Sequence, residues 1–239
     1  MSTRRFSAAI VAETARGFAA VIPDIKCVSP KHGDMLHGRD PVEVAKGLVR
    51  DGAPVLSIVT EREQFGGSPL LLHTIAEAVD VPLLRKDFIT NAAMLEESVE
   101  LGAAAVLLIS AAVDETTLKQ LYERTLVLGL EPLVEVCTSE EMDFAVALGV
   151  RLIGINNRNI MTLERDDGGP SRTAALAVGA PSDALLISES GIQSAADARL
   201  AVAAGANAVL VGTALWKAAD MSAMYRSLFV ERSNACVRR

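Results

Sequence analysis

The segment Leu186-Ile187-Ser188-Glu189-Ser190-Gly191 is an apolar run that closes in polar residues, and five other segments of the chain follow the same pattern. These five are Ile22-Pro23-Asp24-Ile25-Lys26, Leu83-Leu84-Arg85-Lys86-Asp87, Leu133-Val134-Glu135, Ile153-Gly154-Ile155-Asn156-Asn157 and Val209-Leu210-Val211-Gly212-Thr213. Short apolar runs closed by turn residues are typical of parallel strands that are buried on both faces. In a parallel barrel the carboxyl ends of the strands converge on one face, so we expect the polar ends to meet there, where barrel enzymes carry their chemistry.

An internal repeat favours an eightfold barrel over an open sheet. Gly52, Gly102, Gly149 and Gly205 each follow a helical pattern and precede an apolar strand, at intervals of 50, 47 and 56 residues. Glycine commonly ends a helix by adopting the left-handed conformation. One interval has the length of two βα units, so four glycines, one for each pair of units, correspond to eight units. We therefore predict an α/β fold, a single TIM (β/α)8 barrel domain over residues 1–239.

The predicted elements alternate along the chain. An N-terminal helix is expected over about residues 3–20, and no linker or low-complexity segment divides the rest. The strands are expected near 21–26, 54–59, 82–86, 105–110, 132–136, 152–156, 184–189 and 208–212. The helices are expected near 41–51, 69–79, 91–101, 114–128, 139–148, 171–178, 194–204 and 217–230. Thr138 with Glu141 and Ser194 with Asp197 resemble capping boxes. Two long loops, 27–40 and 158–170, are candidate lids or substrate clamps.

Composition limits the kind of partner and the compartment. The chain has 239 residues, half of them hydrophobic, and a net charge of −7 without a basic block, so we expect no nucleic-acid partner. No apolar run is long enough to span a membrane and no signal peptide is apparent, so we expect no membrane partner. Cys27, Cys137 and Cys236 show neither disulfide nor metal spacing, which favours the cytoplasm. The three histidines show no ligand spacing either, and we expect neither a metal nor another cofactor.

Four ionisable residues near strand ends could perform acid–base chemistry. Lys26, Lys86, Glu135 and Glu189 belong to the first, third, fifth and seventh predicted units, and odd strands contribute to shared inward layers of a barrel. In a cavity that excludes water, such lysines and carboxylates shift one another's pKa values and can supply a general acid and a general base. A structural network of ion pairs is the alternative, and it is the weaker one because apolar packing often stabilises a core equally well.

Glycines after the last two strands indicate an anion site. Gly191 follows the seventh strand, and Gly212 and Thr213 follow the eighth. Glycine lets backbone N–H groups approach an anion, and barrels often bind phosphate between these two loops. Two ordinary turns remain the alternative.

At the sixth strand end, Asn156 could bind hydroxyls and Arg158 could hold a carboxylate, or the segment could be a solvated loop. The residues alone thus predict acid–base chemistry on a small phosphorylated substrate.

Several of these segments resemble the indole-3-glycerol phosphate synthase family over about residues 18–217. The matching segments are IPDIKCVSPKHG (22–33), FGGS (65–68), LLRKDFI (83–89), LVEV (133–136), IGINNRN (153–159), ISESGI (187–192) and LVGTAL (210–215). The resemblance implies ring closure, decarboxylation and dehydration of 1-(2-carboxyphenylamino)-1-deoxyribulose 5-phosphate. The partner is then a small phosphorylated anilino-sugar substrate, and the chain is expected to be a monomer or a homodimer.

The resemblance also implies roles for individual residues. Lys86 would be the principal general acid, and Lys26 would contact the substrate carboxylate or serve as a second acid. Glu135 would act as acid or base in dehydration, and Asn156 and Glu189 would position hydroxyls and lysines. Further residues would bind the substrate: Phe65 against the aromatic ring, Arg158 at the anthranilate carboxylate, Ser190 in the pocket lining, and Ser29, Gly191, Gly212 and Thr213 at the phosphate.

The chain departs from the family pattern on the predicted active face. Asp24, a further candidate catalytic residue, stands where the family has Glu, and its side chain is one methylene shorter. Cys137 and Asn159 replace the usual His and Asp, and the N-terminal extension is short. These departures leave two alternatives open: a paralogue acting on a modified anilino-sugar phosphate in secondary metabolism, and a barrel that binds a phosphorylated ligand without catalysis.

Overall fold

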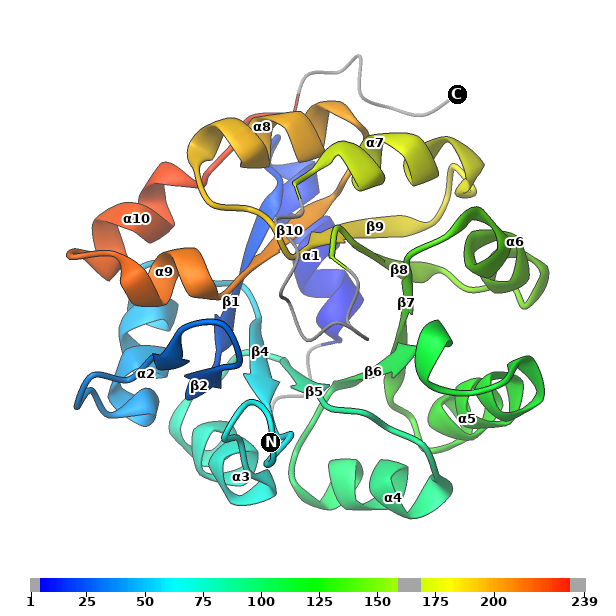
Figure 1. The fold of residues 1–239 in the computed structure, drawn as a ribbon, viewed down its shortest axis with the longest axis horizontal. Helices are drawn as coiled ribbons and strands as arrows, with labels where there is room; N and C mark the ends of the chain where they lie inside the picture. Colours follow the sequence, from blue (N-terminus) through cyan, green and yellow to red (C-terminus); the bar gives the residue numbers. More distant parts are fainter. Residues whose placement is uncertain (1–4, 159–168, 233–239) are drawn as a thin grey trace.

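Eight parallel strands close into a barrel that is surrounded by helices (Figure 1). The computed structural model describes residues 5–158 and 169–232. The order round the barrel is β1-β10-β9-β8-β7-β6-β5-β4, and β1 pairs with β4 to close it. The strands are β1 Ala20–Ile25, β4 Leu56–Val59, β5 Leu83–Lys86, β6 Ala105–Ile109, β7 Glu131–Val136, β8 Leu152–Asn156, β9 Leu185–Glu189 and β10 Ala208–Val211. The predicted TIM barrel is therefore confirmed, and each strand lies within two residues of its expected bounds.

The pairing register determines which side chains share a height inside the barrel. Followed once round the barrel from Asp24, the register leads back to position 16, eight residues earlier. This stagger is the one that TIM barrels have, and it places inward side chains from alternate strands in common layers. The lower layers are apolar, with Ile22, Leu84, Leu107 and Leu133 among the buried side chains. Only the uppermost layers, at the carboxyl ends of the strands, are polar.

The helices form the outer ring, and their ends carry the signals that the sequence predicted. They are α2 Pro41–Arg50, α3 Pro69–Ala78, α4 Ala92–Glu100, α5 Glu115–Val127, α6 Ser139–Ala147, α7 Ser171–Leu176, α8 Ala195–Ala203, α9 Thr213–Lys217 and α10 Met221–Ser227, with 3-10 turns η1 Ser110–Ala112 and η3 Ala177–Gly179. The Thr138 hydroxyl accepts the Glu141 N–H, and Ser194 accepts that of Asp197 in the same way. The four repeat glycines all have positive φ angles, from 79° to 106°. The predicted cap residues at helix starts and the predicted glycines at helix ends are thus confirmed.

The N-terminal helix closes the amino end of the barrel. Helix α1 spans Phe6–Ala15, and Phe6 and Ile10 are buried against the apolar lower layers. The N–H and hydroxyl of Ser7 both bond the carboxylate of Glu131, the first residue of β7. The expected helix over 3–20 is too long, because Gly17 with φ of 89° turns the chain. Residues 1–4 lie outside the described residues.

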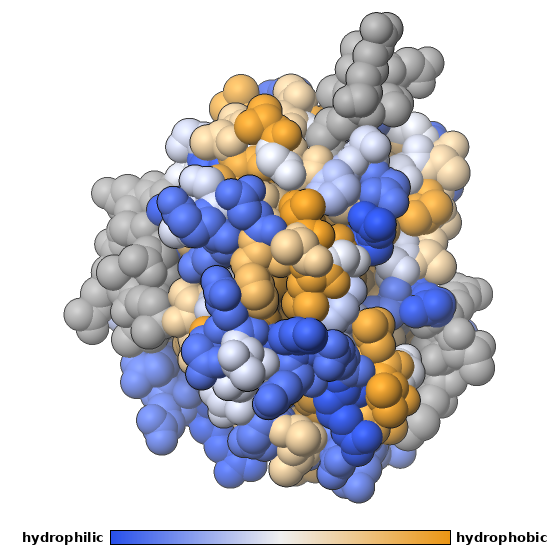
Figure 2. All heavy atoms as spheres, turned by 90° about the vertical axis from the view of Figure 1, so that its right-hand side faces the viewer, coloured by the Kyte–Doolittle hydropathy of each residue, from blue (hydrophilic) through white to orange (hydrophobic). Residues whose placement is uncertain are grey.

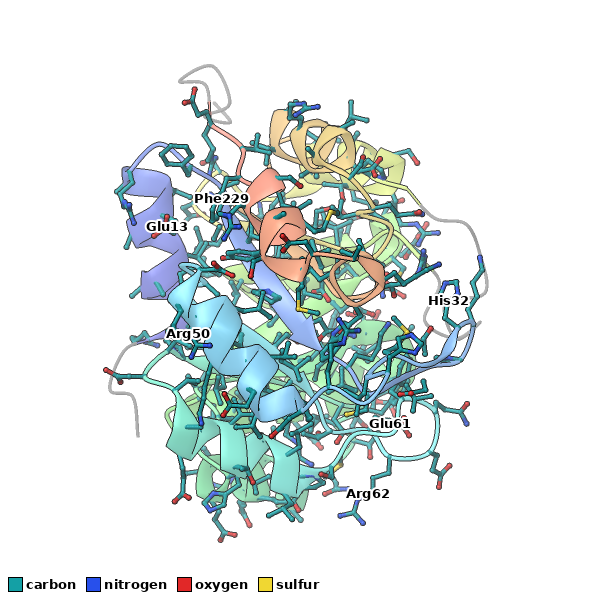
Figure 3. The ribbon with its side chains drawn as sticks, turned by 90° about the vertical axis from the view of Figure 1, so that its left-hand side faces the viewer. Glu13, His32, Arg50, Glu61, Arg62 and Phe229 are labelled. Carbon is teal, nitrogen blue, oxygen red and sulfur yellow. The ribbon has the colours of Figure 1, made fainter. Side chains whose placement is uncertain are left out.

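Two more sequence expectations need correction. The helix expected over 217–230 is two helices, α9 and α10, because Ala218 is extended and the side chain of Asp220 caps α10. The loop 27–40 contains a short hairpin of β2 Val28–Ser29 and β3 Gly33–Asp34. Figure 3 shows His32, at the hairpin tip, at the end of the molecule opposite Glu13 of α1. The hairpin therefore stands over the carboxyl face and the helix under the amino face.

One side of the outer surface combines hydrophilic and apolar areas. Figure 2 shows the side covered by α5 and α6, where polar side chains alternate with smaller apolar areas. Leu126 and Val127 of α5 are among the exposed large apolar residues. None of the helices in the described part of the chain is long and apolar enough to cross a membrane.

Candidate active site

The uppermost enclosed layer of the barrel brings four charged residues together. By the register, Asp24, Lys86, Glu135 and Glu189 occupy one layer, supplied by β1, β5, β7 and β9. Lys26, which the sequence analysis grouped with these residues, lies above this layer and lines the same two cavities as Lys86. Residues two apart on a strand point the same way, so Lys26 lies one layer above Asp24. The layer therefore contains three carboxyl groups and one lysine.

Glu189 is the most perturbed member of this layer. Its carboxyl group lies against Gly154 of β8, where a Cβ atom would come within 2.0 Å of Oε1. Its pKa is raised to about 8, chiefly by burial and next by the Glu135 carboxylate, while Lys86 opposes the rise and Asp24 adds to it. Neither carboxyl oxygen of Glu189 has a hydrogen-bond partner among the described residues. Glu189 is consequently a candidate proton donor at neutral pH.

Asp24 is held from two sides. The Ser57 hydroxyl of β4 donates to Asp24 Oδ1 over 2.6 Å, and both side chains are buried. On the other side Gly212 packs so closely that its Cβ would lie 3.1 Å from Asp24 Oδ2. The Trp216 indole N–H of α9 donates to the Asp24 carbonyl over 2.8 Å. The shorter side chain that distinguishes this sequence is therefore fixed in place by the barrel wall.

Lys26 and Lys86 lie between two adjoining cavities. Lys26 Nζ donates to the Thr213 hydroxyl over 3.2 Å on one side. On the other side it lies 5.7 Å from the centre of the Phe65 ring, a cation–π contact. Both lysines, together with Asp24, line both cavities. Their ammonium groups can thus reach a ligand that extends from one cavity into the other.

The larger cavity has a volume of about 410 Å³ and is rich in cationic groups. Its walls include the predicted residues Arg158, Ser190, Gly191, Gly212 and Thr213. They also include side chains that the sequence analysis did not single out as binding residues, namely Lys31, His32, Gln193 and Lys217. Burial lowers the pKa of His32, and Lys217, Lys31, Lys26 and Arg158 lower it further, in that order. This cavity therefore favours an anion in a protein of negative net charge.

The smaller cavity is lined by apolar side chains and, in equal number, by charged ones that include Asp24, Glu61 and Asp87. Phe65, Phe88, Val59, Leu107 and Ile109 surround it, next to the two lysines. The Glu61 carboxylate accepts the N–H groups of residues 63, 64 and 65 and so fixes the loop that carries Phe65. Figure 3 shows Glu61 on the same side of the molecule as His32. With a volume of about 20 Å³ it is a narrow recess, so an aromatic ring could enter beside Phe65 and Phe88 only if these side chains moved apart.

The side chain next to Lys86 on β5 anchors this strand end. Arg85 is buried on the opposite, helix-facing side of the strand. Its guanidinium donates to the Thr60 hydroxyl, to the Met94 carbonyl and to Ser98, and it forms ion pairs with Asp87 and Glu97. These contacts join β4, β5 and α4. Lys86 therefore projects from a rigid support.

The remaining predicted residues differ in their placement. Asn156 is buried in the barrel, and its side-chain oxygen accepts the Arg158 N–H over 2.9 Å. Ser29 is buried and borders neither cavity. Cys137 donates to the Arg158 carbonyl, and burial, with Glu135 second, raises its thiol pKa to about 12. Asn159 and Cys236 lie outside the described residues.

The fold and site together define a (β/α)8 barrel that carries an acid–base layer and a cationic cavity at the carboxyl ends of its strands. Among the described residues, no group of three or more His, Cys, Asp or Glu side chains is arranged to hold a metal ion. The family model described as indole-3-glycerol phosphate synthase matches residues 1–228.

Proteins named indole-3-glycerol phosphate synthase are similar over most of this chain. The Micrococcus luteus protein is 43% identical over 195 residues, which are 82% of this chain and 72% of the relative. The Pyrococcus abyssi protein is 40% identical over 211 residues, which are 88% of this chain and 91% of the relative. The chain belongs to the indole-3-glycerol phosphate synthase family.

Proposed function

We propose that this chain is an indole-3-glycerol phosphate synthase. It converts 1-(2-carboxyphenylamino)-1-deoxyribulose 5-phosphate into indole-3-glycerol phosphate, carbon dioxide and water. The observation that carries the proposal is the position of Lys86, which lines both the smaller and the larger, cationic cavity. A substrate with an aromatic ring at one end and a phosphate at the other then places its ketone beside this ammonium group.

The two cavities orient the substrate by its two ends. The anthranilate ring packs on Phe65, and the phosphate binds at Gly191, Gly212 and Thr213, where the cationic walls favour a dianion. Arg158 holds the ring carboxylate, and Ser190 completes the pocket wall. Ser29 is part of the hairpin and borders neither cavity, so it would reach the phosphate only if the hairpin moved. Fixing both ends aligns the ring carbon with the ketone carbon.

Lys86 performs the first proton transfer. As the ring carbon that bears the carboxylate attacks the ketone carbon, a C–C bond forms and the ketone oxygen takes a proton from the Lys86 ammonium. The carboxylate then leaves as carbon dioxide, and the electron pair of its bond restores the aromatic ring. Lys26, one layer higher and next to Thr213, contacts the departing carboxylate or serves as a second acid.

Dehydration completes the indole. The new hydroxyl group leaves as water when it is protonated, and a base removes the proton from the neighbouring carbon. Glu135 is the acid or base for this step. Asn156 and a protonated Glu189 orient the hydroxyl groups and lysines, and Asp24 belongs to the same charged layer. The raised pKa of Glu189 supports its role as a hydrogen-bond donor at neutral pH.

Indole fluorescence tests this proposal. Purified protein is mixed with 1-(2-carboxyphenylamino)-1-deoxyribulose 5-phosphate, and Lys86→Ala is compared with the wild type. Loss of a general acid predicts a fall in kcat of about 10²- to 10⁴-fold. Turnover of Lys86→Ala within a few-fold of the wild type would contradict the assigned role. Substrate binding without product over long incubation would instead favour the non-catalytic barrel.

One alternative is a paralogue with a modified anilino-sugar phosphate as substrate. It is kept because Asp24 stands where the family has Glu. On that alternative, Asp24→Glu raises activity on the ordinary substrate because it restores the usual length of the side chain. Activity that is unchanged or lower would count against it. The tight contacts of Asp24 with Ser57 and Gly212 favour the ordinary reaction with Asp as a tolerated variation.

The proposal also covers the cellular compartment and the oligomeric state. Cys27 and Cys137 are free thiols, which supports a reducing cytoplasm as the site of action. Because the cavities described above are formed within one chain, a monomer or a homodimer can carry the activity. Light scattering of the purified protein distinguishes these two states.

A further inference from the structure

We propose that Asn157 is a positioning residue that holds the backbone of the turn Ser190–Gly191 in its phosphate-binding conformation. The inference rests on the proposed function, because that function assigns this turn to the substrate phosphate. Asn157 follows β8 directly, and its side chain is buried away from both cavities. It therefore acts on the ligand only through the turn.

The turn has a backbone conformation that needs support. Ser190 has a φ angle of 62° and Gly191 one of 71°, so two successive residues are in the left-handed region. For a residue with a Cβ atom this conformation is unfavourable, and it persists where surrounding contacts determine it. Both residues line the cationic cavity. The strained conformation thus occurs at the point where an anion would meet the backbone.

Asn157 supplies contacts that determine this conformation. Its side-chain nitrogen lies 2.9 Å from the Glu189 carbonyl oxygen and 3.1 Å from that of Ser190. The Asn157 backbone N–H donates to the Glu189 carbonyl as well, over 2.8 Å. One residue therefore binds the last carbonyl of β9 and the first carbonyl of the turn.

The Asn157 amide is itself held in one orientation. Its oxygen accepts the backbone N–H of Thr173 over 3.0 Å and the Thr173 hydroxyl over 2.9 Å. Its nitrogen also lies 2.9 Å from the Ser188 hydroxyl, which is 2.7 Å from that of Thr173. All of these groups are buried, so water does not replace a missing partner easily. The start of α7 is thereby linked to the turn after β9.

The strand ladder explains why Asn157 affects the turn more than it affects the position of Glu189. Glu189 is paired with Asn156 on one side and with Leu210 on the other. Ser190 lies beyond both ladders and depends on the side chain of Asn157. Loss of this amide should therefore weaken phosphate binding while the Glu189 carboxyl group keeps its place.

Asn157→Asp tests the inference because it keeps the oxygen that Thr173 bonds and removes the N–H groups that bond the turn. We measure KM and kcat with the phosphorylated substrate, inhibition by inorganic phosphate, and kcat/KM with the substrate that lacks the phosphate group. We expect KM and the inhibition constant of phosphate to rise about tenfold, the usual effect of losing a buried hydrogen bond. The kcat and the activity on the dephosphorylated substrate should change less than about threefold.

Thr125→Val is the matched control. Thr125 is also a buried hydroxyl, bonded to the Leu121 carbonyl within α5 and distant from the cavities. The Thr125→Val substitution should lower thermal stability without changing the inhibition constant of phosphate. Thr173→Val is the milder second variant, needed if Asn157→Asp does not fold, and it should raise the phosphate inhibition constant in the same direction by a smaller factor.

The outcomes separate this inference from the proposed function. Unchanged phosphate inhibition in folded Asn157→Asp and Thr173→Val, or equal losses with both substrates, would overturn the inference and leave the synthase assignment intact. A wild-type protein that neither turns over the substrate nor binds phosphate would overturn the proposed function, and this inference with it.

Discussion

Glu189 shows how one buried side chain links the chemistry of the site to the stability of the protein. In the unfolded chain its carboxyl group ionises near pH 4.5, whereas burial raises its pKa to about 8 in the folded protein. Between these values the folded state holds a proton that the unfolded state has lost. Stability should therefore fall as pH rises from about 4.5 through 8, by up to about 1.4 kcal/mol per pH unit from this group.

Glu189→Gln should remove this contribution because the amide does not ionise. We expect urea unfolding between pH 5 and pH 8 to depend less on pH in the variant than in the wild type. The exposed Glu100 provides the control, since Glu100→Gln should leave the pH dependence unchanged. If the free energy of unfolding changed with pH equally in Glu189→Gln and in the wild type, the Glu189 carboxyl group would be ionised in the folded protein.

Individual active-site residues were predictable from the sequence in kind but not always in position. Lys26, Lys86, Glu135 and Glu189 were expected in shared inward layers, and the register places the last three in one layer. Asp24 joins them and Lys26 lies above them, because a layer is set by the stagger of the whole barrel. Asn157 was expected only as one of several strand-end amides. Its orientation toward α7 depends on Thr173, which is 16 residues away in sequence.

At the scale of elements, helix α1 closes the barrel and should contribute to stability without contributing to binding. Phe6 is fully buried against the lower layers, whereas Val11 of the same helix is 47% exposed. Phe6→Ala should lower the free energy of unfolding by about 3–5 kcal/mol, as expected for a large buried aromatic residue. Denaturant unfolding measures this loss.

The matched substitution Val11→Ala should cost less than about 0.5 kcal/mol, as is usual for surface positions. The KM of folded Phe6→Ala should equal that of the wild type, because the helix lies at the end opposite His32 (Figure 3), which lines the cationic cavity. A raised KM in that variant would mean that the two ends of the barrel are coupled.

Local sequence signals predicted the ends of elements well where the whole signal lies within a few residues. Pro41 and Pro69 occupy first helical turns, and Thr138 and Ser194 cap their helices as predicted, although Glu141 and Asp197 bond the N–H groups of Cys137 and Gln193 instead of those of the cap residues. The division between α9 and α10 was missed because their apolar positions continue one pattern. The hairpin in loop 27–40 was missed because its two-residue strands are too short to show alternation.

At the scale of the whole molecule, the distribution of charge matters more than its sum. The net charge is −7, yet Lys31, Lys217, Lys26 and Arg158 converge on one cavity. Such a local field raises the concentration of an anionic substrate and is screened by salt. Lys217→Ala should therefore raise the KM for the phosphorylated substrate by roughly threefold. The KM of the variant should also respond less to added salt.

Steady-state kinetics from low to high ionic strength measures both effects. Lys119→Ala is the control, because Lys119 lies on the outer face of α5, paired with Glu123. An identical salt response in Lys217→Ala and the wild type would exclude Lys217 from the field that acts on the substrate.

The sequence by itself determined the alternation of strands and helices, the eightfold count and the face that carries the chemistry. These depend on local periodicity, on caps and on glycines that can adopt positive φ angles, all of which are encoded within a few neighbouring residues. Only the tertiary structure decided that Asp24 shares the charged layer with Lys86, Glu135 and Glu189, that Lys31 and Lys217 join the anion cavity, and that the Asn157 amide contacts the turn at Ser190. The reason is physical: these contacts join strands and loops far apart in the chain, and the stagger of the closed barrel fixes which of them meet.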